Sequence, residues 1–190
     1  MIANQRRRIF DGMAAALAYH GYEDTKITDV VELAGLSRAT FYERFDSKEV
    51  CFAAAYEDGV ERLTAAVEAA AAGEIAWDTR LSAGLRAGLD FLAADPALAH
   101  LLLVEALAAA RPARLEHERS LTRLAEALRP PAAVPGGEVM PEETPRLLAG
   151  GLTSHLSGRV LAGETERLAE DHDLLLQYLL TAGEPPTSAS

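Results

Sequence analysis

Hydrophobic residues recur every three or four positions along most of the chain, which is the spacing typical of amphipathic helices. No segment alternates apolar and polar residues with enrichment in β-branched side chains, so we expect no β-sheet. Helix limits follow from candidate caps and from the positions of Pro and Gly. The predicted helices span residues 4–19, 28–34, 38–45, 46–73, 78–93, 96–109, 112–128, 145–162 and 165–182. The sequence therefore predicts an all-α protein of about nine helices, with a breaker-rich loop at 130–145.

Residues 28–45 contain two short helical patterns that meet at a turn. Gly35 tolerates the left-handed φ that often ends a helix. Ser37 is a preferred N-cap for the second helix, and Leu36 can pack into the angle between the two. A helix, a glycine-containing turn and a second helix form the helix-turn-helix motif, whose second helix enters the major groove of DNA.

The second helix of this pair has an inward and an outward face. Phe41 and Phe45 lie four residues apart and share the inward face. Arginine can read guanine, alanine and threonine can contact the thymine methyl group, and hydroxyl groups can donate to phosphates. The side chains predicted to face DNA are Ser37, Arg38, Ala39, Thr40, Tyr42, Glu43 and Arg44. Glu43 suits two roles, accepting from cytosine N4 or repelling phosphates, and the spacing alone also fits an ordinary helical hairpin with a solvated face.

The next helix is predicted to begin at Asp46 and Ser47, with Asp46 and Glu49 forming a capping box. Lys48 falls in its first turn, where free amides and the positive end of the helix dipole face outward. We expect Lys48 to bind a phosphate there. Three arginines at positions 6–8 add a basic cluster that can reach a phosphate or the minor groove.

Residues 27–57, ITDVVELAGLSRATFYERFDSKEVCFAAAYE, resemble the DNA-binding domain of the tetracycline-repressor (TetR-type) family of transcriptional regulators. The resemblance rests on Ala-Gly-Leu-Ser at 34–37, Thr-Phe-Tyr-x-x-Phe at 40–45 and Asp-Ser-Lys-Glu at 46–49, and covers about residues 8–56. It implies DNA contacts at Thr40, Tyr42 and Lys48. The sequence departs from the family at Lys26, where threonine is more usual. We expect Thr25 or Thr28 to cap the helix and contact phosphate instead.

The resemblance also implies a domain organisation. Residues 1–47 are interpreted as the helix-turn-helix domain, 48–183 as a helical domain for effector binding and dimerisation, and 184–190 as a disordered tail. It implies a homodimer built from the last two helices, and Gly150, Gly151 and Gly158 would allow their close approach. The predicted dimer ridges are Leu148, Leu152, Leu156, Val160, Leu168, Leu175 and Leu179.

Polar and aromatic side chains interrupt the otherwise apolar C-terminal helices, as a small-molecule site requires. The candidate ligand-binding residues are Trp77, Phe91, His100, Leu103, Glu105 and His155. The alternative interpretation is that both histidines are satisfied core or interface residues and that Glu105 lies at the surface. The resemblance implies that an effector binds this region, changes the separation of two DNA-binding domains and lowers DNA affinity.

The formal net charge of −11 is unexpected for a DNA-binding protein. The acidity is uneven, since the first 50 residues carry 7 basic and 8 acidic side chains and the remainder 11 and 21. An acidic body suppresses non-specific adhesion to DNA. The single cysteine, Cys51, fits a reducing compartment, and no secretory signal or membrane-spanning run is apparent. We therefore expect a cytoplasmic protein.

No pattern indicates an enzyme. The five histidines and Cys51 lack metal-ligand spacing, and there is no glycine-rich phosphate loop or Gly-x-Ser-x-Gly sequence. We predict no metal and no cofactor, and read residues 171–173 as a solvated helix face. The prediction is a homodimeric regulator, a repressor, that binds a palindromic operator in double-stranded DNA and is released by a small molecule. An all-helical interaction module without DNA binding, or a helical enzyme using His100 and Glu105, are the alternatives.

Overall fold

The computed structural model describes residues 2–106, 111–129 and 141–181 and confirms the all-α class. These residues form nine α-helices, a π-helical turn and a 3₁₀ segment, and contain no strand. The α-helices are α1 (Ile2–Asp24), α2 (Ile27–Ala34), α3 (Arg38–Tyr42), α4 (Lys48–Ala71), α5 (Trp77–Ala94), α6 (Pro96–His100), α8 (Arg111–Ala127), α9 (Thr144–Leu161) and α10 (His172–Thr181). The π-helical turn is η1 (Leu101–Glu105) and the 3₁₀ segment is η2 (Thr165–Asp171). Most of the predicted loop at 130–145 and the whole predicted tail lie outside the described residues.

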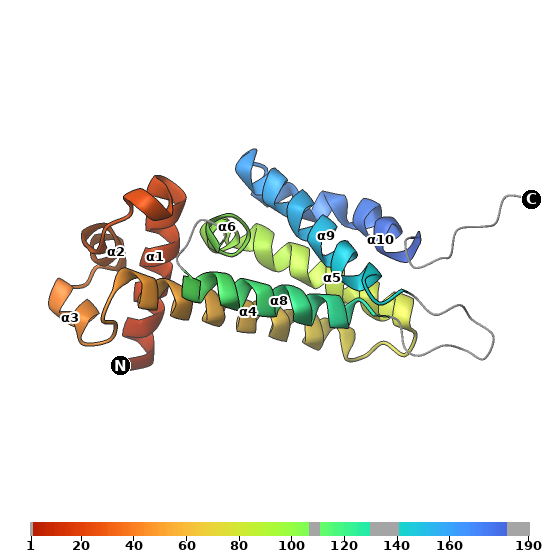
Figure 1. Cartoon of the computed structure of the whole chain (residues 1–190), viewed down its shortest axis with the longest axis horizontal. Coiled ribbons are helices and arrows are strands. Elements are labelled where there is room, and N and C mark those ends of the chain that lie inside the picture. Colours follow the sequence, from red (N-terminus) through yellow and green to blue (C-terminus); the bar gives the residue numbers. More distant parts are fainter. Residues whose placement is uncertain (1, 107–110, 130–140, 182–190) are drawn as a thin grey trace, which may run out of the picture.

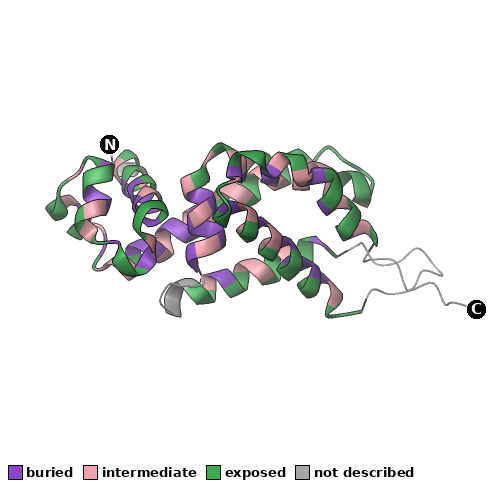
Figure 2. Cartoon of the chain, turned by 90° about the horizontal axis from the view of Figure 1, so that it is seen from above, coloured by how far each residue is buried: buried purple, intermediate pink, exposed green. Residues whose placement is uncertain are grey.

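The molecule is elongated, with α1, α2 and α3 gathered at one end (Figure 1). Helix α4 leads from this end along the body and packs against α5 and α8, while α9 and α10 lie against the body on the other side. One hydrophobic core runs through both parts, from Ile9 and Phe41 near the N-terminus to Leu175 on α10. Figure 2 shows buried residues concentrated where the N-terminal helices meet the body. The division of the chain at residues 47 and 48 stays an interpretation, since α4 contacts both α1 and the body.

Helix α1 is longer than predicted. It bends at Gly21, whose φ of 71° and ψ of 170° interrupt the helical backbone, and then continues for one turn to Asp24. The hydroxyl of Thr25 donates to the carbonyl oxygens of Gly21 (2.7 Å) and Ala16 (3.3 Å), which fixes this last turn against the helix. Glycine thus marks a kink rather than the expected end.

Two predicted helices are divided in the structure. The pattern at 96–109 becomes α6 followed by η1, with residues 107–110 outside the described part of the chain. Its predicted start is confirmed, because the Asp95 carboxylate accepts from the Leu98 amide (3.1 Å) and Pro96 occupies the first turn. The pattern at 165–182 becomes η2 and α10.

The predicted capping box at the start of α4 is wrong in one position. The N-cap is Ser47, whose hydroxyl accepts from the Val50 amide (3.3 Å), so that Asp46 lies outside the helix. Ser47 also lowers the pKa of Glu49 by hydrogen bonding to its carboxylate, with a backbone hydrogen bond adding to the effect. A preferred N-cap residue stood at both positions, and the sequence did not distinguish them.

No single helix among the described residues has both the length and the apolar composition needed to cross a membrane. By length and composition alone, Trp77–Ala94 and Pro96–Glu105 would meet that requirement as a pair, but the two are bent by 109° relative to each other.

Candidate nucleic-acid interface

The turn between α2 and α3 is held by the residues that the sequence indicated. Gly35 has a left-handed φ of 61°, and its amide donates to the Glu32 carbonyl oxygen (3.0 Å), while the Leu36 amide donates to that of Val31 (2.9 Å). Ser37 is the N-cap of α3, and its hydroxyl accepts from the Thr40 amide (3.1 Å). These contacts satisfy groups that a helix end leaves free.

Arg8 of α1 makes a contact at this turn that no pattern in the sequence predicts. Its guanidinium donates to the carbonyl oxygens of Ala34 (3.0 Å) and Gly35 (2.7 Å), where a cation is favoured by the negative end of α2. A side chain at position 35 would place its Cβ 2.7 Å from this guanidinium. The backbone angle thus favours glycine at position 35, a side chain there would displace the Arg8 guanidinium, and Arg8 is engaged at the turn instead of extending freely toward DNA.

The inward face of α3 is aromatic, as predicted. Phe41 is fully buried and Phe45 is 7% exposed. Helix α3 ends at Tyr42, earlier than expected, but the Phe45 amide still donates to the Phe41 carbonyl oxygen (2.9 Å), which keeps the two rings one turn apart. The ring of Phe45 lies 5.8 Å from those of Phe41 and of Phe10 on α1. This cluster fixes how α3 sits on α1.

The outward face of α3 is exposed over most of its length. Tyr42 is 48% exposed although its ring touches that of Phe41 edge-on. Of the residues predicted to face DNA, the exposed ones are Thr28, Ser37, Arg38, Ala39, Tyr42 and Glu43. Within this set, the Ser37 hydroxyl and Arg38 lie side by side in sequence at the start of α3.

Three of the predicted DNA-binding residues are half-buried and have partners within the chain. The Thr40 hydroxyl lies 3.0 Å from that of Ser37, and the Arg44 guanidinium donates to the Gln5 side chain (3.3 Å). The Lys48 ammonium donates to the carbonyl oxygens of Tyr22 (2.6 Å) and Thr25 (3.0 Å) and lies 4.4 Å from the centre of the Tyr22 ring. A phosphate contact at Lys48 would therefore use its remaining N–H.

The start of α2 is capped differently from the expectation. Neither Thr25 nor Thr28 caps it, because the Thr25 hydroxyl is turned toward α1 and the Thr28 hydroxyl donates to the Asp29 carboxylate (3.4 Å). Asp29 accepts from the Lys26 amide (2.8 Å), as the acidic residue of a capping box does. The spacing of an N-cap position and an acid three residues later would have indicated this role.

The seven residues predicted to form dimer ridges are instead core residues of the single chain. Each is at most 6% exposed, and the set is Leu148, Leu152, Leu156, Val160, Leu168, Leu175 and Leu179. The opposite face of α9 and α10 is the exposed one. It carries Leu147, Leu161, Leu174 and Tyr178, which are 72%, 67%, 60% and 38% exposed. The apolar residues recur at the predicted spacing, but the ridge that they form faces the core of the same chain and not a second copy.

The six candidate ligand-binding residues lie in different settings. His100 and Glu105 are brought together, with Nδ1 and Oε1 3.5 Å apart, and Leu103 is buried in the same turn. Glu105 is itself buried, which contradicts the alternative that placed it at the surface. Phe91 lies under the Arg62 guanidinium, with 5.3 Å between that group and the centre of the ring.

His155 of α9 pairs with Asp171 (2.8 Å), an acid that also pairs with the Arg159 guanidinium (3.0 Å). The motif at 171–173 is therefore only partly the solvated face that was expected. His172 is buried and contacts Ser82, and Asp173 is exposed. A pocket formed by the six candidate residues stays a prediction.

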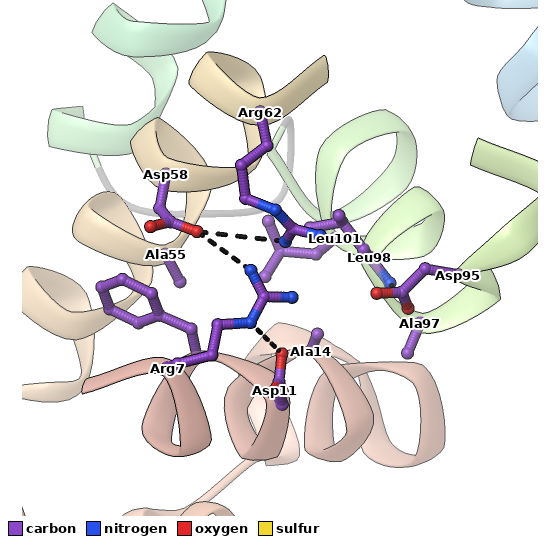
Figure 3. A pocket seen from close by; sticks show the side chains of 11 residues that line it. Arg7, Asp11, Ala14, Ala55, Asp58, Arg62, Asp95, Ala97, Leu98 and Leu101 are labelled. Atoms are coloured by element: carbon purple, nitrogen blue, oxygen red, sulfur yellow. Dashed lines mark hydrogen bonds and ion pairs between the residues drawn. The ribbon is translucent and has the colours of Figure 1, made fainter. Parts of the chain in front are cut away.

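A hollow of about 100 Å³ lies where α1, α4 and α6 meet (Figure 3). Arg7 crosses it, with its Nε 2.9 Å from Asp11 and a terminal nitrogen 3.4 Å from Asp58, which Arg62 also approaches at 4.0 Å. A more open hollow of about 380 Å³ adjoins it between Arg6 and Glu61. None of the six candidate ligand-binding residues lines either hollow. Arg7, like Arg8, is thus engaged within the chain.

An exposed α3 is held by an aromatic cluster behind a capped glycine turn, and a long helix leads from it into the helical body. This arrangement defines a helix-turn-helix protein of the all-α class. Residues 9–55 match the sequence model of "Bacterial regulatory proteins, tetR family". Solved structures of the same family share the fold of the whole chain. The N-terminal part of the chain thus matches the TetR family of transcriptional regulators, and the chain has the fold of solved regulators of that family.

The structures that resemble the chain include two named FadR. The fatty acid degradation regulator FadR from Bacillus halodurans has a TM-score of 0.79 and 18% sequence identity, covering 93% of this chain and 94% of its own. FadR from Bacillus subtilis, solved in complex with stearoyl-CoA, has a TM-score of 0.77 and 18% identity, covering 93% and 98%. The TetR-family regulator PfmR from Thermus thermophilus has a TM-score of 0.66 and 24% identity, covering 90% and 95%. A search of curated proteins returned no match.

Proposed function

We propose that the protein is a homodimeric transcriptional repressor that binds a palindromic site in double-stranded DNA and is released by a small-molecule effector. The observation that carries the proposal is the division of α3 into two faces. Phe41 and Phe45 are buried against α1, while Arg38, Ala39 and Tyr42 are exposed on the other side. A helix mounted in this way can lie along base edges without losing its own packing.

The nine residues expected at the interface divide by chemistry. The hydroxyl groups of Ser37 and Tyr42 suit phosphate oxygens, which set position, and Arg38 and Arg44 suit guanine edges, which set sequence. Glu43 keeps two roles open, since it can accept from cytosine N4 or repel phosphates. Thr28, Ala39, Thr40 and Lys48 complete the set.

A dimer is proposed through the exposed face of α9 and α10. Along α9 the exposed positions Leu147, Gly151, Ser154, Gly158 and Leu161 follow one another every three or four residues, so they share one side of the helix. A side chain added at Gly158 would meet nothing within 4 Å in the single chain. Two leucines that flank small residues on an exposed face suit close packing against a second copy around a two-fold axis.

The effector is proposed to bind the C-terminal domain and to favour a conformation with lower DNA affinity. The support is the family and the FadR structure that contains stearoyl-CoA, which shows that this fold accommodates such a ligand in that protein. The sequence identity of 18% does not carry the ligand over to this chain. We place the protein in the cytoplasm, where its DNA target is found, and propose no enzymatic activity.

The alternative is an interaction module that does not bind DNA, for which the exposed face of α3 would contact another protein. Selection from a pool of random duplexes separates the two. The regulator is expected to enrich a palindrome whose half-sites repeat at about one helical turn. Enrichment should fall with Tyr42→Ala and be kept with Leu115→Ala, an exposed control on α8. Failure of the folded wild-type protein to enrich any sequence would refute DNA recognition.

A further inference from the structure

We infer that Glu105 is a positioning residue for DNA binding. It holds the end of α1 and thereby sets the position of α2 and α3, the DNA-reading helices, relative to the body. The inference rests on the proposed function and names a contact through which that function would be controlled. It starts from a carboxylate that the chain buries to 6% exposure at the end of η1. A buried carboxylate needs compensating partners, because burial removes its hydration.

One partner of Glu105 belongs to the N-terminal helices. Oε2 accepts a hydrogen bond of 2.8 Å from the backbone amide of Tyr22, across 83 residues of sequence. The other oxygen, Oε1, faces Nδ1 of His100 at 3.5 Å, a distance beyond a strong hydrogen bond. Glu105 thus makes its short contact with α1 rather than within its own segment.

The same residue, Tyr22, connects onward to α4. Its carbonyl oxygen accepts from the Lys48 ammonium (2.6 Å), which also donates to the Thr25 carbonyl oxygen (3.0 Å). Lys48 is the first residue of α4, immediately after the segment that follows α3. The turn from Tyr22 to Thr25 is therefore hydrogen-bonded both to the Glu105 carboxylate and to the Lys48 ammonium at the start of α4. Helix α2 begins only two residues later, at Ile27.

The opposite side of η1 is bonded to α9. The hydroxyl of Ser157 donates to the carbonyl oxygen of Leu103 (2.7 Å), two residues before Glu105. Helix α9 also carries the exposed stripe that we propose as the dimer surface. A single turn of five residues thus makes one polar contact to α1, which leads into α2 and α3, and another to α9, the helix that carries the proposed dimer surface.

The conformation of η1 suits a coupling element. It is π-helical directly after the α-helix α6, and isolated π-turns are common at functional sites. Leu101, Leu102, Leu103 and Glu105 are all buried, so the turn cannot shift without moving its neighbours. A change in η1 must either carry the turn at Tyr22 with it or break the bond from Glu105, and both change the position of the reading helices.

The decisive variants alter this contact alone. Glu105→Leu keeps a similar volume and removes the carboxylate that accepts from the Tyr22 amide. Glu105→Gln keeps an oxygen acceptor and tests whether the hydrogen bond to the Tyr22 amide, without the charge, is enough to preserve wild-type behaviour. Glu126→Leu on α8 is the control for the same change of side chain at an exposed position. Each variant is first compared with the wild type by thermal melting.

Two readouts then separate positioning from stability. The first is affinity for the site enriched by the wild-type protein. The second is the distance between spin labels on Tyr19→Cys and Asp90→Cys in one chain, diluted with unlabelled protein. Both positions are exposed, and Cys51 is buried, with its pKa raised to about 12 by burial, so it will not label. These labels report α1 against α5 without requiring DNA or a dimer.

We expect Glu105→Leu to broaden the label distance distribution and to weaken DNA binding by roughly 5-fold to 100-fold. Glu105→Gln and Glu126→Leu should match the wild type in both measurements. A folded Glu105→Leu variant with unchanged distance and unchanged affinity would overturn the inference, even if its melting temperature fell. If Glu105→Leu does not fold, the test uses Ser157→Ala, which removes the hydrogen bond from α9 to η1. This variant should broaden the label distance distribution, and an unchanged distribution would overturn the inference.

The result can be told apart from failure of the proposed function. If the wild-type protein enriches no DNA, the regulator proposal fails, and the label distance alone then decides whether Glu105 positions the reading helices. If the wild type binds DNA and Glu105→Leu behaves identically in both readouts, the regulator stands and the role of Glu105 falls.

Discussion

The hydroxyl of Tyr56 lies 3.0 Å from Nδ1 of His117, and this buried contact joins α4 to α8 across 61 residues of sequence. Burial raises the pKa of Tyr56 to about 12 and lowers the pKa of His117. The phenol therefore keeps its proton and the imidazole stays neutral, so that Nδ1 can accept from the hydroxyl. Protonation of the imidazole would remove that acceptor.

This pair predicts a loss of stability in mild acid. The unfolded histidine binds a proton near its ordinary pKa of 6.5, whereas the folded one binds it only at lower pH. The free energy of unfolding should fall as the pH drops below that value, because the unfolded state takes up the proton first. Thermal melting from neutral pH to about pH 5 measures the effect. His117→Gln, which keeps an acceptor, should reduce the slope, and His20→Gln at an exposed position should leave it unchanged.

Replacement of Phe41 should unfold the N-terminal helices. The side chain is fully buried against Phe45, so Phe41→Ala should cost about 3–5 kcal/mol in the free energy of unfolding. Denaturant titration with the fluorescence of Trp77 or with circular dichroism gives the value. A loss below about 1 kcal/mol would show that α3 is not mounted through this ring.

Tyr42 and Lys48 should differ although both are predicted to contact DNA. Tyr42 is exposed, so Tyr42→Ala should weaken binding about tenfold, equal to about 1.4 kcal/mol, and leave stability within about 0.5 kcal/mol of the wild type. Lys48→Met should weaken binding and also lower stability by about 1–2 kcal/mol, because two backbone carbonyl groups lose their donor. Fluorescence anisotropy and thermal melting on the same samples measure both. Equal stability of the two variants would contradict the internal role of Lys48.

The dimer surface can be tested by a charge on each leucine of the exposed face. Leu161→Glu and Leu174→Glu should each give monomers at micromolar concentration, because a two-fold axis would bring like charges into an apolar contact. Light scattering or sedimentation provides the measurement. Leu115→Glu on α8 has a similar exposure and should remain dimeric. If all three variants keep the oligomeric state of the wild type, the interface lies elsewhere.

Patterns within single turns of the sequence were sufficient to predict α3 and the turn before it. The i, i+4 pair of Phe41 and Phe45, the left-handed glycine at 35 and the cap at Ser37 each act within one turn, so they can be read from the sequence. The direction of the C-terminal ridges could not be read in this way. The last helices have apolar residues on both sides, with Leu148 facing the core and Leu147 facing outward. Helical spacing shows which residues share a face, but it does not show which element packs against that face.

Contacts between residues far apart in the chain could not be predicted from any pattern in the sequence. The bonds from Arg8 to Gly35 and from Glu105 to Tyr22 join residues 27 and 83 positions apart, and each donor or acceptor resembles an ordinary surface charge in the sequence. The π-helical turn was likewise hidden, because its leucines continue the period of α6. The bond from Arg8 holds the turn after α2 against α1, and the bond from Glu105 joins α1 to η1 of the body.

The central claim, that the exposed face of α3 lies along base edges in the major groove, is tested most directly by methylation interference on the enriched duplex. Methylation of guanine at N7 blocks an acceptor in the major groove, whereas methylation of adenine at N3 lies in the minor groove. We predict that N7 methylation within each half-site prevents binding by the wild-type protein, and that N3 methylation at the same half-sites does not. Binding that is indifferent to N7 methylation throughout both half-sites would contradict the account.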